Sequence, residues 1–323
     1  EILDAQQRRQ RVFAAARELF FRLARTHPVV LLIDDLQWAD PDGLALLGEL
    51  MRPPDAPPLL LLASVRNAQE GERGTGDWES RIAVAIPKNR TTLRLEGLQP
   101  RDSEALALGT LAALNATGIS EADALQIVRE SRGHPLFIDA LVRQRMISMT
   151  TFSLTLDEVV WQRARSLPEA ALLVLQLVAL ANGHLQLLTT AKAAEIDFAG
   201  LTTHLALLRA GNFIRTRGVR AGDVVEIFHD TVRLTVRTHL DSGLCRQLNR
   251  RLALALEGNQ SSDVESIAAH WCDAGETQKA VLFAEKAAEK ALGMLAFGRA
   301  AHFYKMCADL SPAAGEPTRQ FRV

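Results

Sequence analysis

The sequence predicts an α/β domain built on a parallel sheet, followed by a chain that is mostly helical. Two continuous apolar runs, VVLLI at 29–33 and LLLLASV at 59–65, stand on either side of a helix-forming segment. Strand, helix and strand in this order form one βαβ unit, and runs that are apolar on both faces suit a parallel sheet covered by helices. Beyond residue 100, abundant Ala and Leu favour helices.

The N-terminal elements follow one another without long gaps. Residues 4–25 have the apolar spacing of an amphipathic helix. Asp40 and Pro41 are the residue types of an N-cap and of a first helical position, so a second helix is expected to begin there. After the second strand, the polar, Gly-containing residues 67–90 predict a surface loop, and a short strand is expected at 93–95.

Helices dominate the remainder. We expect helices at 101–114, 120–131 and 135–147, three more between 156 and 210, and another from about Asp230. Before that last helix, NFIRTR and VVEIF alternate like the strands of a β-hairpin, and helices followed by a hairpin predict a winged-helix domain. The Ala-rich segment after Ser262 resembles the paired helices of a tetratricopeptide repeat, with small residues where helices approach closely: Ala280, Ala284, Ala287 and Ala300.

Composition excludes several classes of protein. The formal net charge is −1, from 37 basic and 38 acidic residues, so no global field draws the chain to nucleic acid or acidic lipid. The three cysteines form no CxxC pair, which argues against a structural zinc site and suits a reducing cytosol. No apolar run approaches the roughly 18 residues of a membrane span. We therefore expect a cytoplasmic protein without a membrane segment.

Two adjacent carboxylates, Asp34 and Asp35, follow the first strand directly. Acids at the carboxyl end of a buried strand are the Walker B arrangement of P-loop nucleotide-hydrolysing enzymes, and this edge of a parallel sheet is where ligands bind. Asp34 would hold Mg²⁺, which bridges the β- and γ-phosphates, and Asp35 would orient or deprotonate the attacking water. Taken alone, the same acids could equally be turn or capping residues.

The surrounding residues extend this pattern. IDDLQWADP, followed one strand later by LLLLASVR, resembles the STAND branch of the AAA-like P-loop ATPases, as fused to bacterial LuxR-type regulators, nucleotide cyclases and Ser/Thr kinases. The resemblance implies that Arg66 reads the γ-phosphate; otherwise it is a solvated arginine at a strand end. Gln37 and Trp38 belong to the same phrase and are expected to have packing or loop roles.

Two later motifs agree in order with this family. Gly133-His134-Pro135 resembles the Gly-x-Pro motif, which implies that Gly133 and Pro135 lie at the nucleotide, with the proline against the adenine. Phe228-His229-Asp230 resembles the Met-His-Asp motif of NB-ARC switch proteins, with Phe in place of Met, which implies that His229 reaches a phosphate. The alternatives are helix termination at Gly133, a first helical turn at Pro135, and Asp230 as a helix cap beside a surface His229.

With this resemblance, the chain divides into four expected parts. They are the C-terminal half of a P-loop ATPase core at 1–98, a helical lid at 99–150, a winged-helix-like domain at 151–258, and the start of a tetratricopeptide-like repeat array at 259–323. A Walker A sequence, GxxxxGK[ST], does not occur in the chain. We therefore expect a fragment truncated before that loop, with ATP or ADP and Mg²⁺ as cofactors of the intact parent and hydrolysis by this chain alone improbable. A degenerate ATPase is the alternative.

Three hypotheses about function follow. The first is an ATP/ADP-dependent signalling switch that controls an attached output domain, self-associates on activation and binds protein partners through its repeats. The second is a non-enzymatic helical interaction scaffold with a vestigial ATPase half. The third is a winged-helix regulator that binds DNA through basic residues of the wing region and the following helix, which the near-neutral net charge disfavours. These residues are Arg209, Arg215, Arg217, Arg220, Arg233 and Arg237.

Overall fold

A computed structural model describes residues 4–65, 82, 90–114, 121–147, 155–181, 183–259 and 263–310. The chain forms two units, residues 1–93 together with 281–323, and residues 94–280. The expected surface loop at 67–90 lies outside the described residues except for its two members Ile82 and Arg90. Each unit is considered by itself below.

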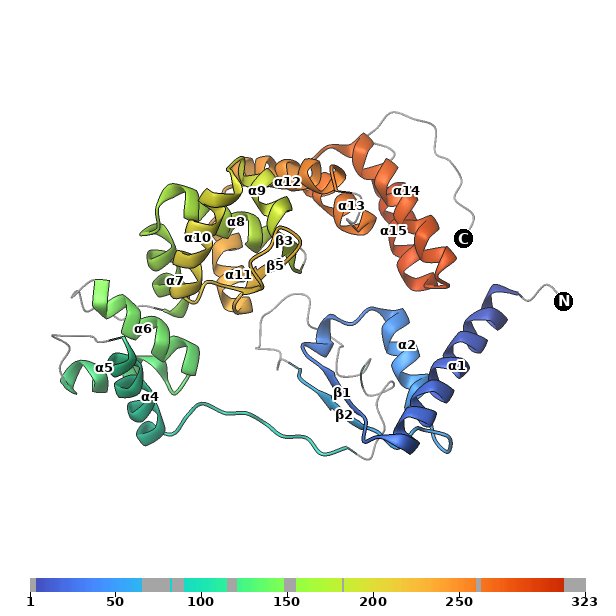
Figure 1. Ribbon diagram of the computed structural model, residues 1–323, viewed down its shortest axis with the longest axis horizontal. Helices are drawn as coiled ribbons and strands as arrows, with labels where there is room; N and C mark the ends of the chain where they lie inside the picture. Colours follow the sequence, from blue (N-terminus) through green and yellow to red (C-terminus); the bar gives the residue numbers. More distant parts are fainter. Residues whose placement is uncertain are drawn as a thin grey trace. The chain divides into compact units, whose positions relative to one another are not determined.

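The first unit contains the predicted βαβ arrangement (Figure 1). Its elements are α1 (Ala5–Thr26), β1 (Val30–Ile33), the 3-10 turn η1 (Leu36–Trp38), α2 (Pro41–Leu50), β2 (Leu60–Ala63), most of α14 (Thr277–Gly293) and α15 (Phe297–Leu310). Strands β1 and β2 pair in parallel, and their register runs from Val30 opposite Leu60 to Ile33 opposite Ala63. The predicted strand, helix and strand are confirmed, and so is the N-cap of α2, where Asp40 accepts a hydrogen bond from the Gly43 N–H.

Only one face of this small sheet is buried. On that face Ile33 packs against the buried Leu36, Leu44 and Leu47, and Ile82 completes the cluster. The opposite face is formed by alternate residues of both strands and is exposed: Val30, Leu32, Leu60 and Leu62. Within the residues that the structure describes, the expected helical cover is found on one face of the sheet only. Side chains alternate between the two faces of a sheet, and here a helical layer covers one of them.

Asp42, in the first turn of α2, joins three helices of the first unit. It accepts a hydrogen bond from Arg9 of α1 at 2.8 Å and another from the backbone N–H of Arg299 of α15 at 2.9 Å. The Arg9 guanidinium also lies over the rings of Phe13 and Phe297, at 5.0 and 5.4 Å from their centroids. A carboxylate at a helix N-terminus is favoured by the helix dipole, so Asp42 suits this junction.

The second unit is mainly helical. Its elements are α4 (Pro100–Ala113), α5 (Glu121–Ser131), α6 (Pro135–Ile147), α7 (Leu156–Arg165), α8 (Glu169–Leu180), β3 (Leu185–Gln186), α9 (Leu187–Ala194), α10 (Phe198–Ala210), β4 (Ile214–Arg217), β5 (Val224–Ile227), α11 (Asp230–Thr238), α12 (Ser242–Glu257) and α13 (Val264–Asp273). The predicted β-hairpin is confirmed, since β4 and β5 pair antiparallel, and β3 joins them in the order β3-β5-β4.

Two details of the sequence interpretation are wrong. Four helices, not three, lie between residues 156 and 210, because the two-residue strand β3 separates α8 from α9. No strand forms at 93–95, where residues 90–99 lack regular secondary structure and Leu93 and Leu95 are 84% and 96% exposed. A strand requires a neighbour for its backbone hydrogen bonds, and no described strand pairs with this segment.

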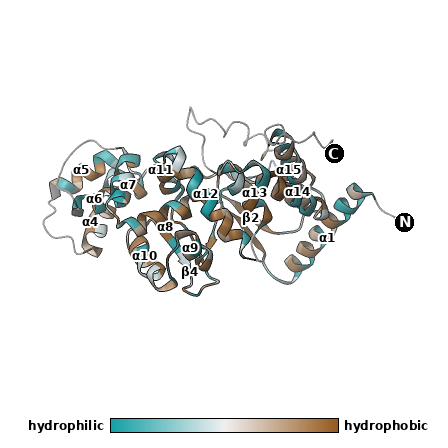
Figure 2. Cartoon of the chain, turned by 90° about the horizontal axis from the view of Figure 1, so that it is seen from above, coloured by the Kyte–Doolittle hydropathy of each residue, from teal (hydrophilic) through white to brown (hydrophobic). Residues whose placement is uncertain are grey.

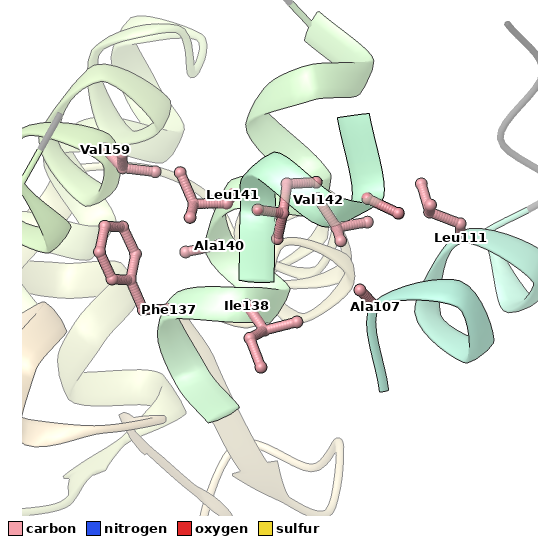
Figure 3. Packing of buried hydrophobic residues seen from close by; sticks show 10 residues of the cluster. Ala107, Leu111, Phe137, Ile138, Ala140, Leu141, Val142 and Val159 are labelled. Atoms are coloured by element: carbon pink, nitrogen blue, oxygen red, sulfur yellow. The ribbon is translucent and has the colours of Figure 1, made fainter. Parts of the chain in front are cut away.

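Helices α4, α5, α6 and α7 share one apolar core (Figure 3). Helix α6 contributes Phe137, Ile138 and Leu141 among others to this core, and Val159 of α7 belongs to the same cluster. Helix α8 is mostly coloured as hydrophobic in Figure 2 and packs against α9, α10, α11 and α12. Among the described residues, no helix has the length and apolar composition that crossing a membrane requires.

His270 is a buried polar residue between α12 and α13. The amide of Asn249 donates to the Cys245 carbonyl at 2.9 Å, so its Oδ1 is the acceptor for the Nδ1–H of His270 at 2.8 Å. Burial, and secondarily the positive charge of Arg237, lower the pKa of His270 from 6.5 to about 4. The folded protein therefore contains His270 as the neutral, Nδ1-protonated tautomer near neutral pH.

This burial predicts a pH-dependent stability. Because the folded pKa of His270 is below the unfolded value, its contribution is complete above pH 6.5 and is lost as the pH falls towards 4. We expect the free energy of unfolding to drop by about 2 kcal/mol between pH 7.5 and pH 5 through this group. Urea unfolding at both pH values measures it. His270→Asn keeps a donor near Asn249 but cannot titrate, so an equal drop in that variant would contradict the assignment.

Candidate functional site

The two predicted acids lie at the carboxyl end of β1, where the chain turns sharply into η1. Asp35 has a left-handed backbone conformation, with φ 54° and ψ 47°, which Asp adopts more readily than most residues. Asp34 is exposed and Asp35 is half-buried. The left-handed residue ends the strand, so the two consecutive carboxylates stand in the turn and outside the sheet.

Ser64, the residue directly after β2, connects this turn to the neighbouring strand. Its Oγ donates a short hydrogen bond to Asp34 Oδ1 and accepts one from the Asp35 N–H at 2.8 Å. Its backbone N–H donates to the Ile33 carbonyl, and its carbonyl accepts from the Leu36 N–H, both at 2.9 Å. One serine therefore fixes the main chain on both sides of the two acids.

Gln37 holds the second acid. Its side-chain amide donates to Asp35 Oδ1 at 2.9 Å, which restricts the rotation of that carboxylate. The prediction that Gln37 has a packing or loop role is thus refined, because its amide contacts Asp35 directly. Arg66, the expected γ-phosphate sensor, lies outside the described residues.

The oxygen-rich turn suits Mg²⁺. Hard divalent cations take oxygen ligands, and Mg²⁺ in nucleotide sites is commonly held by one or two carboxylates together with phosphate oxygens and water. Asp34 and Asp35 supply such carboxylates, with the Ser64 hydroxyl beside them. Within the described residues, no group of three or more His, Cys, Asp or Glu side chains is arranged to hold a metal, so a dedicated all-protein cage is not found there.

Gly133 and Pro135, in the second unit, stand between α5 and α6. Gly133 has a φ of 76°, and an added Cβ would lie 2.3 Å from the carbonyl oxygen of Leu98. Its own carbonyl accepts a hydrogen bond from the Leu98 N–H at 2.7 Å. Pro135 is the first residue of α6. The expected helix termination and helix start are therefore both observed, and glycine is required at 133 by backbone contact.

His229 is the N-cap of α11, and its Nδ1 accepts a hydrogen bond from the Thr231 N–H at 3.1 Å. The alternative that Asp230 is the cap is wrong. Asp230 is instead the first helical residue and lies 3.5 Å from Arg233, one turn along the helix. The imidazole occupies the cap because its unprotonated nitrogen can replace the usual carboxylate or hydroxyl acceptor. The proton of the neutral ring then resides on Nε2.

Comparisons with known proteins address the family and the fold of the chain. Residues 1–62 match the family described as the AAA ATPase domain. No curated protein matches the chain. Among solved structures, a Signal Transduction ATPase with Numerous Domains (STAND) protein with a tetratricopeptide repeat sensor from Pyrococcus horikoshii superposes with a TM-score of 0.62 at 12% identity, over 94% of this chain.

The predicted resemblance to a STAND-type, AAA-like module is confirmed. The structural likeness shows a shared fold, and this chain spans 41% of the length of the Pyrococcus protein. The candidate site is thus described in two parts. Asp34, Asp35 and Ser64 lie together in the first unit, while Gly133, Pro135 and His229 lie in the second.

Sequence reasoning missed Ser64 and the contact made by Gln37. Ser64 is one residue past the end of a strand, and a single serine there carries no motif. The signal available was its place in the register: if β1 and β2 pair in parallel, the residues that follow Ile33 and Ala63 must be neighbours. Asp34 and Ser64 are those residues.

Replacing Ser64 tests this arrangement. Ser64→Ala removes both Oγ hydrogen bonds, so we expect a loss of about 1 kcal/mol in the stability of the turn. Hydrogen exchange of the Asp35 amide, measured by NMR, should accelerate because its acceptor is gone. Ser64→Thr retains the hydroxyl and should preserve the slow exchange of wild type. Equal exchange in the two variants would show that Ser64 Oγ does not hold Asp35.

Proposed function

We propose that this chain is part of an ATP- and ADP-dependent signalling switch that regulates an attached output domain. The observation that carries the proposal is the paired carboxylate turn after β1, which Ser64 holds to β2. Asp34 and Asp35 lie within residues 1–62, the segment that matches the AAA ATPase domain. The comparisons support a signalling ATPase-type module. The nucleotide response and the control of an output domain are the proposal.

The first unit supplies the groups for phosphate chemistry. Asp34 would hold Mg²⁺, which when bound supplies positive charge to the phosphate oxygens. Asp35, oriented by Gln37, would accept a hydrogen bond from the attacking water and withdraw its proton. Arg66, two residues beyond Ser64, would contact the γ-phosphate. Each role is an assignment by the family motif, supported by the position of the acids at the carboxyl edge of the sheet.

The second unit supplies the groups for closing over the nucleotide. Pro135 and the tight backbone at Gly133 would lie against the adenine, and His229 would donate from Nε2 to a phosphate oxygen. The order α8, β3, α9, α10, β4 and β5 supports a winged-helix assignment for 151–258, because a helix, a strand, two helices and a hairpin follow one another around one sheet. In this proposal the ATPase core part comprises residues 1–98, the helical lid residues 99–150 and the repeat part residues 259–323.

In this proposal, exchange of ADP for ATP moves the winged-helix and repeat parts and permits self-association. The buried face of α14 supports the repeat assignment, because Ala280, Ala284 and Ala287 are fully buried there and Ala300 of α15 is nearly so. Such close helix packing is typical of tetratricopeptide arrays, whose concave surfaces bind proteins. Protein partners would therefore be engaged through residues 259–323.

Direct DNA binding is the weaker candidate. The basic residues of the β4 strand that would face a phosphate backbone, Arg215 and Arg217, both lie within ion-pair distance of Glu226 on β5, at 2.9 and 3.4 Å. Their charge is therefore partly compensated inside the hairpin itself. The scaffold hypothesis differs from the switch in that it requires no effect of nucleotide.

Calorimetric titration with ATP, in the presence and in the absence of Mg²⁺, tests the switch proposal. We expect weak binding by this chain, with a Kd on the order of 1 mM, because no Walker A sequence supplies further phosphate contacts. Mg²⁺ should strengthen the binding, and Asp34→Ala should remove that gain. Asp55→Ala, which changes an exposed acid of the turn before β2, is the matched control and should retain it. A wild-type affinity that Mg²⁺ does not change would favour the scaffold.

A further inference from the structure

The turn between α10 and β4, residues 210–213, is held by side chains from a distant part of the second unit. Arg143 of α6 donates to the Ala210 carbonyl at 2.8 Å. Asn212 donates from its amide to Asp139 of α6 at 3.2 Å. These contacts join residues 67 and 73 positions apart in the sequence. The helical segment that begins at Pro135 is thereby attached to the hairpin of the following domain.

Asp139 is the centre of this arrangement. Both of its oxygens accept from Arg143 Nε, at 2.9 and 3.0 Å, in addition to the bond from Asn212. The two charged side chains are largely buried, with 22% and 18% of their surfaces exposed. Hydrogen bonds to charged, partly buried groups are stronger than neutral surface ones. Asp139 is therefore bonded at once to its own helix and to the hairpin turn.

The Asp139 carboxylate also stabilises the charge of a second arginine, Arg163. Arg163 of α7 is buried, lies over the Phe213 ring at 4.9 Å from its centroid, and donates to the Gly211 carbonyl at 2.5 Å. Burial lowers the pKa of Arg163 to about 10, an effect that the negative charge of Asp139 opposes and that of Arg143 reinforces. Removal of the Asp139 charge would leave two neighbouring guanidinium groups without their shared anion.

The turn is directly connected to His229. Phe213 accepts a hydrogen bond at its carbonyl from the Phe228 N–H, at 2.9 Å, and Phe228 precedes the histidine. On the other side of His229, helix α11 is bound to α7: Thr235 donates to Asp157 at 2.6 Å, and His239 stacks on Trp161 with centroids 4.5 Å apart. Helix α7 in turn contributes to the core shared by α4, α5 and α6.

We propose that Asp139, Arg143 and Asn212 form a latch that fixes the Gly133–Pro135 segment relative to His229. Asp139 lies one helical turn after Pro135. Asn212 lies in the turn before β4, and β5, the strand that pairs with β4, ends shortly before His229. The latch consists of protein groups alone, so it holds the two segments together before any nucleotide binds. Its importance for a switch rests on the proposed function. Any movement of the hairpin domain away from α6 must break these bonds.

Hydrogen exchange of the full chain without nucleotide tests the latch. Asn212 has a φ of 55°, which Asp tolerates, so Asn212→Asp preserves the backbone while placing a carboxylate against Asp139. The amides of Gly211, Asn212 and Phe213 are hydrogen-bonded to α10, and we expect them to exchange at least about tenfold faster in this variant. Asp139→Asn should have the same effect in the same peptide.

Exchanging the side chains of residues 139 and 212 should restore slow amide exchange. A general loss of stability in the single variants would not be reversed in this way. In the double variant D139N/N212D, an amide on α6 faces a carboxylate in the turn, so the hydrogen bond re-forms with opposite polarity and Arg143 regains an anion. We expect slow exchange to return at 211–213. Failure of the double variant to slow exchange below the level of Asn212→Asp would overturn the proposal, as would unchanged exchange in both single variants.

The control is Asp123→Asn. Asp123 pairs with Arg145 at 2.8 Å with similar burial, but this ion pair joins α5 to α6 and does not reach the hairpin. Exchange at 211–213 should stay at the wild-type rate, and acceleration there equal to that in Asn212→Asp would contradict the latch. Should Asn212→Asp not fold, Arg143→Gln tests the same contact. Because no nucleotide is present, these results are independent of whether the Mg-ATP titration succeeds.

Discussion

The parallel pairing of β1 with β2 is the constraint on which the N-terminal site depends. A parallel ladder places the carboxyl ends of both strands at one edge, and the observed register puts Asp34 beside Ser64. A shift by one residue would turn every side chain of the strand to the other face and separate these two residues. The placement of the two acids beside the serine that holds them thus depends on a single register. The packing of Ile33 on the cluster that contains Leu44 and Leu47 helps to maintain this register.

In the second unit, the corresponding constraint is the burial of charge at the junction of α6, α7 and the hairpin turn. Arg163 is buried beneath Phe213 and would be costly there without acceptors and a nearby anion. The Gly211 carbonyl accepts from Arg163, the neighbouring Ala210 carbonyl accepts from Arg143, and Asp139 supplies the anion. Apolar packing of Val159 against the α6 residues brings the elements together, but it is not directional. The charged groups determine which carbonyl oxygens of the turn α6 and α7 contact, and thus how the hairpin turn is oriented against these helices.

Much of the fold could be predicted from local patterns. The two apolar runs, the Asp40–Pro41 helix start and the alternation in NFIRTR and VVEIF each have a local physical cause, and each is found in the structure. Residues 93–95 show the limit of such reasoning, because the alternating Leu-Arg-Leu is compatible with a strand but forms one only beside a partner strand. The two-residue β3 was missed for the converse reason, since its pairing with β5 comes from residues almost 40 positions away.

For the site, Asp34 and Asp35 were recognisable because consecutive acids after an apolar run are unusual. Ser64 and Asp139 were not, because their partners are set by tertiary contacts.

The motifs at Gly133 and His229 have structural roles that are complete without a ligand, and this bears on how they are interpreted. Gly133 is required by the closeness of Leu98, and His229 caps α11. For His229, the observed capping role is compatible with the phosphate contact proposed above. Acceptance of the Thr231 N–H requires Nδ1 to be unprotonated, so the neutral ring must carry its proton on Nε2. A phosphate oxygen needs a donor, and the cap fixes the tautomer that provides one. A carboxylate cap at the same position would satisfy Thr231 equally well but would repel a phosphate. In the proposed function, histidine at 229 would therefore cap α11 and offer its Nε2–H to a phosphate oxygen, which a carboxylate cap could not do.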